Sequence, residues 1–270
     1  METWKRTVYI SLVCVFCTAF GVSQLAPILP LYFHDLGVQT PEAMSLWSGL
    51  ATGATYIIVC LAAPFWGRVA DKKGRKITLI RSSFGMALCN VLIAFQTTPE
   101  GVVLIRLIQG LVSGFYSASI TLIASETPIE RTGWALGLLA SANLAGSLIG
   151  PLLGGYIADT VGIRNDFIIV GALMGLAGVL ATIFIHENYV PQPNPEKLSI
   201  RKLKEQIPEF NSIVALCVAS FIYAICIMSL QPVISVYIKG IVSSDTENLA
   251  FIAGAVFSAM GIAQLMSSSP

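Results

Sequence analysis

Long apolar stretches separated by short polar segments limit the fold of this sequence more than any other feature. A helix needs about 20 mostly apolar residues to cross the hydrocarbon core of a bilayer. Within lipid, every backbone N–H and C=O group must be paired inside the protein, so stretches of this length form helices. We therefore expect an all-α integral membrane protein with eight spans, at about Val8–Phe33, Met44–Trp66, Ile77–Phe95, Val102–Ile123, Trp134–Ile157, Phe167–Ile185, Ile213–Ile238 and Leu249–Met266.

The composition agrees with a membrane protein and excludes a soluble domain. Of the 270 residues, 55% are hydrophobic and 11% are charged, whereas soluble domains carry about 25% charged residues. Nothing in the sequence suggests nucleic-acid binding, a cofactor or an enzyme, since no nucleophile–base pair, metal cluster or phosphate-binding loop lies at the end of a span. The cysteines lie inside apolar stretches without acidic or His neighbours, so we interpret them as packing residues rather than disulfides or metal ligands: Cys14, Cys17, Cys60, Cys89, Cys217 and Cys226.

The distribution of Lys and Arg predicts the orientation of the spans. With the N-terminus placed inside, thirteen of the sixteen Lys and Arg residues fall on the inner side and two, Arg164 and Lys239, on the outer side. Positive charge is retained on the cytoplasmic side of membrane proteins. The sequence therefore predicts a multi-pass protein of the cell membrane with a cytoplasmic N-terminus.

The segment Gly67–Lys76, between the second and third spans, holds five of the Lys and Arg residues. We predict a ten-residue cytoplasmic loop in which Gly67 and Gly74 permit tight turns. Asp71 is expected to accept hydrogen bonds from helix N-terminal amides or to pair with a cation. The candidate cations are Arg68, Arg75 and Arg131, and Lys76 closes the segment. The simpler interpretation is a positively charged membrane anchor.

A polar stripe runs along the fourth predicted span. Arg106 is the only Lys or Arg deep within a span, where a charge costs about 2.5–3.5 kcal/mol or more, so it should face a cavity or a polar partner. It is either a structural arginine that binds backbone carbonyls or a cavity residue coupled to proton movement. Gln24, in the first span, is a further cavity candidate. At helical spacing the stripe comprises Arg106, Gln109, Gly110, Ser113, Ser117 and Thr121.

The predicted spans hold no central Asp or Glu that would carry a proton. Asp35 and Glu126 lie at span ends, where ordinary boundary charges are expected. In the first span, Pro27 and Pro30 should kink the helix near its outer end.

The fifth span carries small residues on one ridge. Gly146, Gly150 and Gly154 recur every fourth residue, and Pro151 and Gly155 lie beside them. Small residues allow close helix contact, and a proline removes a backbone hydrogen bond and bends the helix. Plain helix packing is sufficient to explain this physics.

The seventh and eighth spans repeat the first and second after a shift of 205 residues, and Pro27 and Tyr32 then match Pro232 and Tyr237. Transporters are often built from two such halves. We predict a six-helix bundle at 1–186, a cytoplasmic linker at 187–211, and at 212–270 the first two spans of a second bundle. By this repeat, a second copy of the basic loop and four more spans should follow, so we expect a chain truncated after its eighth span.

Three motifs resemble those of the major facilitator superfamily, in its order and at its spans. The segment Gly67–Lys76 resembles its loop between spans two and three, Ile105–Gly110 its fourth-span motif, and Gly146–Gly155 the fifth-span motif of its drug/proton antiporter branch. The resemblance implies a major-facilitator-type helical bundle. It also implies a basic loop that latches the two halves together, and a bent fifth span that limits leak.

The function that this resemblance implies is proton-coupled export of small amphipathic compounds by alternating access. The expected partners are the exported compound, protons, membrane lipid and a complementary C-terminal half. Two alternatives stay open at this point. One is a permease for a defined metabolite, and the other is an inactive fragment or one that assembles with another chain.

Overall fold

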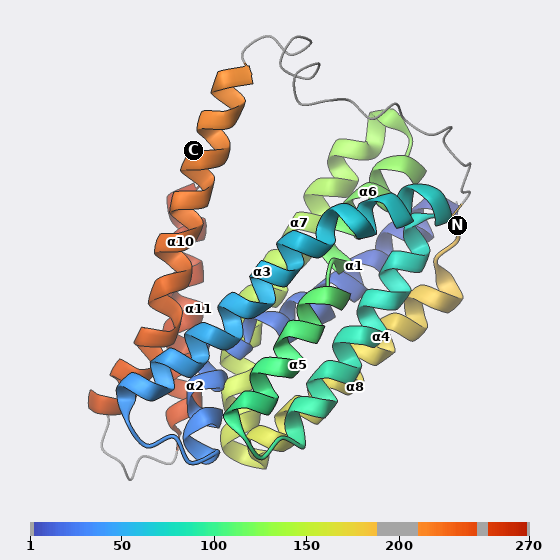
Figure 1. The fold of residues 1–270 in the computed structure, drawn as a ribbon. Coiled ribbons are helices and arrows are strands. Elements are labelled where there is room, and N and C mark those ends of the chain that lie inside the picture. The colour runs from blue at the N-terminus through green and yellow to red at the C-terminus, as the bar shows by residue number, and fades with distance from the viewer. Residues whose placement is uncertain (1–2, 188–209, 242–247, 269–270) are drawn as a thin grey trace.

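The computed structural model describes residues 3–187, 210–241 and 248–268, and all of its regular elements there are helices (Figure 1). The predicted all-α fold is confirmed. The helices are α1 (Thr3–Ser23), α2 (Leu25–Asp35), α3 (Pro41–Lys73), α4 (Arg75–Ala94), α5 (Pro99–Val112), α6 (Phe115–Glu126), α7 (Ile129–Val161), α8 (Ile163–Phe184), α10 (Phe210–Ile241) and α11 (Leu249–Ser268).

Six spans in the described chain are long and apolar enough to cross a membrane, and each overlaps one of the first six predicted spans. Helices α10 and α11 occupy the seventh and eighth. Their continuous apolar stretches within the described residues, Ser212–Cys226 and Leu249–Ala263, are shorter. Most of the predicted linker 187–211 lies outside the described residues, and the domain boundaries stay a prediction.

Two of the predicted spans are each divided into two helices. The first is interrupted at Gln24, between α1 and α2, and the fourth at Ser113 and Gly114, between α5 and α6. The first interruption lies N-terminal to Pro27 because a proline ring clashes with the carbonyl of the residue four positions earlier, which here is Ser23. Gly114 adopts φ +115°, a backbone conformation that favours glycine.

The structure corrects the prediction of a ten-residue loop at Gly67–Lys76. Helix α3 continues through Lys73, and α4 begins at Arg75. Gly74 alone breaks the helix, with φ +92°. Gly67 lies within α3 and provides no turn, and a Cβ atom there would meet nothing within 4 Å. The basic residues of this segment therefore extend a helix beyond the apolar part of the span.

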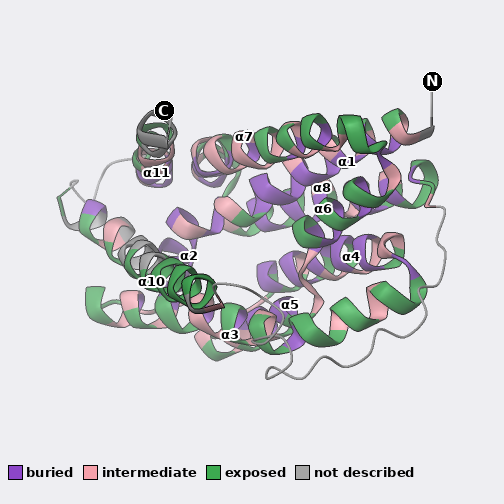
Figure 2. Ribbon diagram, turned by 90° about the horizontal axis from the view of Figure 1, so that it is seen from above, coloured by how far each residue is buried: buried purple, intermediate pink, exposed green. Residues whose placement is uncertain are grey.

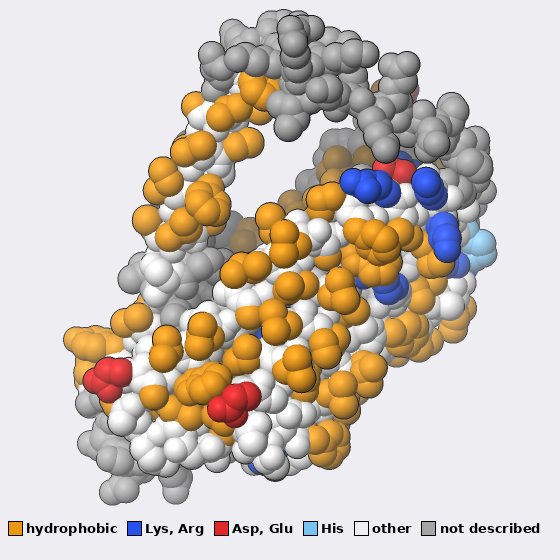
Figure 3. Space-filling view, in the orientation of Figure 1, with side chains coloured by type: hydrophobic (Ala, Val, Ile, Leu, Met, Phe, Trp, Pro, Cys, Tyr) orange, Lys and Arg blue, Asp and Glu red, His pale blue; other side chains and the backbone are white. Residues whose placement is uncertain are grey.

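The helices lie side by side along one direction, so the molecule has two ends (Figures 1 and 2). We call the end where α3 passes into α4 the basic end, and the other the opposite end. Lys and Arg side chains gather at the basic end in the face shown in Figure 3, and apolar side chains cover much of the rest of that face. Exposed Ile57, Leu61 and Leu88 are among the apolar residues that this arrangement turns outward. Such a surface suits lipid.

Two of the buried apolar clusters hold the helices together. Near the basic end, Cys14 of α1 packs with residues of α4, α6, α7 and α8. Near the opposite end, Tyr32 of α2 packs edge-on against Phe167 of α8, with ring centroids 5.1 Å apart, and its hydroxyl donates to the Ile93 carbonyl at 2.7 Å. Helix α11 packs along α7, and α10 meets α2 and α3. The seventh and eighth spans thus contact the first six at α7, α2 and α3.

Candidate functional site

A buried polar pair lies at the break in the first span. Gln24 separates α1 from α2, and Asp166 lies in the first turn of α8. Both side chains are 0% exposed. Gln24 Nε2 donates to Asp166 Oδ2 at 3.0 Å. The other oxygens of the pair, Gln24 Oε1 and Asp166 Oδ1, have no hydrogen-bond partner.

The glycine ridge of α7 packs directly against this break. A Cβ atom on Gly146 would lie 2.6 Å from the Phe16 carbonyl oxygen, and one on Gly150 would lie 2.5 Å from that of Phe20. At Gly154 an added Cβ would lie 2.6 Å from the Cβ of Gln24 and would overlap its amide oxygen. The three glycines therefore allow α1 and the residue at its end to approach the α7 backbone.

The same stretch of α7 contacts α11 on another side. A Cβ atom on Gly155 would overlap the Ala250 carbonyl oxygen, and one on Gly254 would overlap the Pro151 carbonyl oxygen. Ser258 Oγ donates to the Leu148 carbonyl at 2.6 Å. The predicted motif therefore joins α1 of the first bundle to α11 of the predicted second one.

Asp159, one turn further along α7, caps the first turn of α11. Its Oδ1 accepts from the Ala250 N–H at 3.1 Å, and its Oδ2 accepts from the Phe251 N–H at 2.7 Å. The first N–H groups of a helix have no partner within the helix, and they carry partial positive charge. A carboxylate at this position satisfies two of them.

Arg106 and Gln109 are both buried in α5. Arg106 Nη1 donates to Gln109 Oε1 at 2.6 Å, while Arg106 Nε has no partner. The backbone carbonyl of Arg106 accepts from Thr55 Oγ1 of α3 at 3.0 Å. Gly110 lets α3 approach, because a Cβ there would overlap the Thr55 carbonyl oxygen. These contacts pack α5 against α3.

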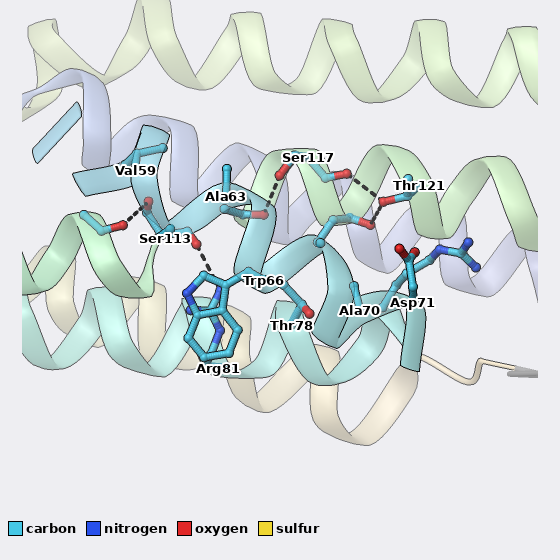
Figure 4. A pocket seen from close by; sticks show the side chains of 16 residues that line it. Val59, Ala63, Trp66, Ala70, Asp71, Thr78, Arg81, Ser113, Ser117 and Thr121 are labelled. Carbon is cyan, nitrogen blue, oxygen red and sulfur yellow. Dashed lines mark hydrogen bonds between the residues drawn. The ribbon is translucent and has the colours of Figure 1, made fainter. Parts of the chain in front are cut away.

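A cavity of about 330 Å³ lies toward the basic end between α3, α4, α5 and α6 (Figure 4). Arg81 of α4 is beside the break between α5 and α6, where its Nη1 donates to the Leu111 carbonyl at 3.2 Å and its Nη2 to that of Ser113 at 3.0 Å. Its guanidinium stacks over the Trp66 ring at 3.4 Å from the centroid. Arginine planes pair favourably with aromatic faces. Arg81 thus ties α3 and α4 to the interrupted span.

A second carboxylate cap lies at the basic end. Glu187, just after α8, accepts from the N–H groups of Arg75 and Lys76, each at 2.8 Å. Glycine at position 74 serves both the turn and this contact. A Cβ atom there would lie only 2.7 Å from a Glu187 carboxylate oxygen. Glu187 therefore caps α4, which has no acidic residue in its own first turn.

The structure places the predicted site residues in separate groups. Gly67, Asp71, Arg75, Gly110 and Ser113 line the cavity. Gln24 lies with the α7 glycines, and the side chains of Arg106 and Gln109 bond each other within α5 and do not line the cavity. Arg68 is exposed, and Lys76 contributes its N–H to the Glu187 cap.

The sequence interpretation missed four side chains that make structural contacts at these places: Arg81, Asp159, Asp166 and Glu187. Their hydrogen-bond partners lie 30 to 142 residues away along the chain, so hydropathy and motif spacing carry no signal for them. Across the part of the chain that the structure describes, no group of three or more His, Cys, Asp or Glu side chains could hold a metal ion.

The sequence model of the Major Facilitator Superfamily matches residues 11–269 of this chain. The chain belongs to this superfamily. The predicted resemblance and the major-facilitator-type bundle are confirmed, and membership of this transporter superfamily agrees with the expectation that the chain is not an enzyme.

Among superfamily members, multidrug resistance protein MdtG of Proteus mirabilis (strain HI4320) is 36% identical over 267 residues, which are 99% of this chain and 66% of that protein. The multi-drug resistance efflux pump PmrA homolog of Lactococcus lactis subsp. lactis (strain IL1403) is 40% identical over 266 residues, which are 98% of this chain and 65% of that protein. The chain thus spans just under two thirds of the length of these relatives.

Solved structures agree on the fold. The crystal structure of the human organic anion transporter MFSD10 (TETRAN) has a TM-score of 0.67 at 17% identity and covers 97% of this chain and 72% of that one. The crystal structure of a D-xylose-proton symporter has a TM-score of 0.63 at 16% identity and covers 97% and 66%. At these identities the likeness concerns the superfamily fold alone.

Proposed function

We propose that the protein serves proton-coupled export of small amphipathic compounds across the cell membrane. The observation that carries this proposal is the likeness along 98–99% of the chain to proteins named as a multidrug resistance protein and a multidrug efflux pump. The exchange cycle is proposed for this chain together with a complementary C-terminal half, which corresponds to the part of the relatives that the chain does not match.

Alternating access is the mechanism that the α7 contacts favour. In this mechanism two helical bundles rock about a site between them. Helix α7 packs on α1 with one row of glycines and on α11 with Pro151 and Gly155, so rocking of the second bundle would act on α7. We assign the polar stripe that begins at Arg106 to the transport pathway, and the segment Gly67–Lys76 to a gate at the basic end.

The orientation is part of the proposal. Basic side chains collect where α3 passes into α4 (Figure 3), and positive charge stays in the cytoplasm. We therefore place the basic end and the N-terminus in the cytoplasm, and the opposite end outside the cell.

Ethidium accumulation in cells that produce this chain tests the export proposal. Cells carrying the vector without the gene serve as the control. We expect cells with the chain to accumulate less ethidium, and a protonophore to remove the difference because it collapses the proton gradient. Export that persists with the protonophore would contradict proton coupling. If accumulation equals that of the control even with the complementary half co-produced, the export proposal fails.

A further inference from the structure

Asp166 differs from every other acidic residue in the described part of the chain because its side chain is fully buried. Arg106 is the one other charged side chain that is buried there. Among the residues that the structure describes, Asp166 makes no ion pair, and its side-chain hydrogen-bond partner is the amide of Gln24. An ionisable group inside a membrane span is costly and is usually functional. Packing alone therefore does not explain why a carboxyl group occupies this position.

The unpartnered atoms of this pair point to a bound proton. Asp166 Oδ1 and Gln24 Oε1 are both buried acceptors without a donor, and a buried polar group that is left unpaired loses its hydrogen bonds to water without replacement. A proton on Oδ1 turns that oxygen into a donor. The neighbouring Gln24 Oε1 is an acceptor on the amide whose Nε2 already bonds Oδ2. A proton on Oδ1 would thus give this buried oxygen a hydrogen to donate, and Gln24 Oε1 is the unpaired acceptor on its partner side chain.

Other ionisable groups toward the opposite end, where Asp166 lies, either have hydrogen-bond partners or are exposed. Tyr32 donates to the Ile93 carbonyl, Arg164 donates to the Gln96 carbonyl, and Asp159 caps α11. His34 and Asp35 lie 3.8 Å apart, with exposed side chains. Helices α1 and α4, which pack against α8, carry their Lys and Arg residues toward the basic end: Lys5, Arg6, Arg75, Lys76 and Arg81. None of these groups neutralises Asp166.

Gln24, the partner of Asp166, contacts α7 close to the place where α7 packs on α11. Gln24 lies between α1 and α2, and its side chain packs against Gly154 of α7. The next residue, Gly155, contacts α11, and Asp159 caps that helix one turn later. A change in the Gln24–Asp166 contact would therefore alter the surface against which α7 and α11 pack.

We propose that Asp166 is the proton-binding residue of the exchange and that Gln24 links its protonation to the α1–α7 contact. This inference rests on the proposed function. In each cycle H⁺ from the external water adds to the carboxylate to form a carboxylic acid, and the same H⁺ later leaves to the cytoplasmic water. No electrons move, and one positive charge crosses with each proton.

Transport by variants in membrane vesicles is the first test. We expect Asp166→Asn to abolish ethidium-driven proton movement while downhill ethidium flux continues, because asparagine mimics the neutral acid permanently. Asp166→Glu should restore some proton movement. The matched control is Asp35→Asn, which neutralises an exposed acid at the same end and should behave as the wild type. Proton movement that survives in Asp166→Asn overturns the inference.

A second measurement uses the wild-type chain and does not depend on the folding of a variant. A hydrophobic carbodiimide reacts with protonated carboxyl groups in apolar surroundings, and peptide mass spectrometry locates the adduct. We expect the carbodiimide to label Asp166, and the extent of labelling to decrease as the buffer is made more alkaline. Ethidium should slow the labelling. Absence of labelling at every pH overturns the inference. Labelling in a chain that shows no proton-dependent export would instead count against the proposed function.

Discussion

At the scale of single residues, the glycines of α7 show why one motif performs two tasks. Gly146, Gly150 and Gly154 admit α1, whereas Gly155 admits α11. Their spacing was sufficient to predict a packing ridge, because a helix repeats every 3.6 residues. The partner of each glycine could not be predicted, since that depends on how distant helices are arranged.

A methyl group added at Gly150 should therefore weaken the bundle. In Gly150→Ala the new Cβ lies 2.5 Å from the Phe20 carbonyl oxygen, and overpacking of this kind costs about 1–3 kcal/mol. Gly137→Ala is the matched control on the same helix, because nothing lies within 4 Å of its added Cβ. That change should be neutral or stabilise the helix by up to about 1 kcal/mol. Thermal unfolding of the purified proteins in detergent measures both, and equal melting temperatures would contradict the assigned contact.

The Gln24–Asp166 pair marks a limit of inference from sequence at this scale. Gln24 was recognised as a cavity candidate because it interrupts an apolar span. Asp166 was not recognised, because it immediately precedes the predicted sixth span, where a charge is ordinary. The two residues are 142 positions apart, and hydropathy, which is a local property, does not reveal that they meet.

At the scale of elements, helix order was predictable but helix continuity was not. Pro27 and Pro30 predicted a kink near the outer end of the first span, and the structure interrupts the helix at Gln24, three residues before Pro27. The break at Gly114 depends on Arg81 of another helix, which binds the carbonyls left without helical partners there. Similarly, the basic segment after Gly67 was predicted as a loop from its charge, but charged residues also continue helices well.

Removal of the carboxylate that caps α11 should loosen this helix from α7. In Asp159→Ala, the N–H groups of Ala250 and Phe251 lose their acceptor, at a cost of about 1–2 kcal/mol. Cysteines at Tyr156 and Phe251, whose rings lie 6.4 Å apart, report the contact through their cross-linking rate in a chain without its native cysteines. We expect slower cross-linking.

The control for that experiment is Thr160→Ala. The Thr160 hydroxyl bonds carbonyls of its own helix and is exposed, so the cross-linking rate should stay unchanged. Cross-linking that is equally fast in Asp159→Ala would show that the cap contributes nothing to the position of α11.

At the scale of the whole molecule, the sequence supported the helix count of the first six spans, the superfamily and the proposed orientation. Hydropathy predicts the spans because only long apolar helices are stable across the hydrocarbon core, and charge asymmetry predicts the proposed topology. The contact of α11 with α7 could not be predicted from the sequence. That contact depends on surface shape, in which Gly155 and Gly254 permit close approach to the facing helix.

The proposed orientation predicts which end of the molecule is reached from outside the cell. In a chain without native cysteines, a cysteine at Lys72 should react with a membrane-impermeant maleimide only after the cells are permeabilised, because Lys72 lies at the basic end. A cysteine at Asn165, which is exposed at the opposite end, should react in intact cells. The reverse pattern would invert the topology and, with it, the direction of transport.

The cap that Glu187 places on α4 has a consequence for biosynthesis. The acceptor of the Lys76 N–H is synthesised 111 residues after its donor. While the ribosome works through that interval, the start of α4 has to rely on water or lipid head groups for its hydrogen bonds. The cap on the third membrane crossing therefore forms only after the whole of the sixth crossing has been synthesised.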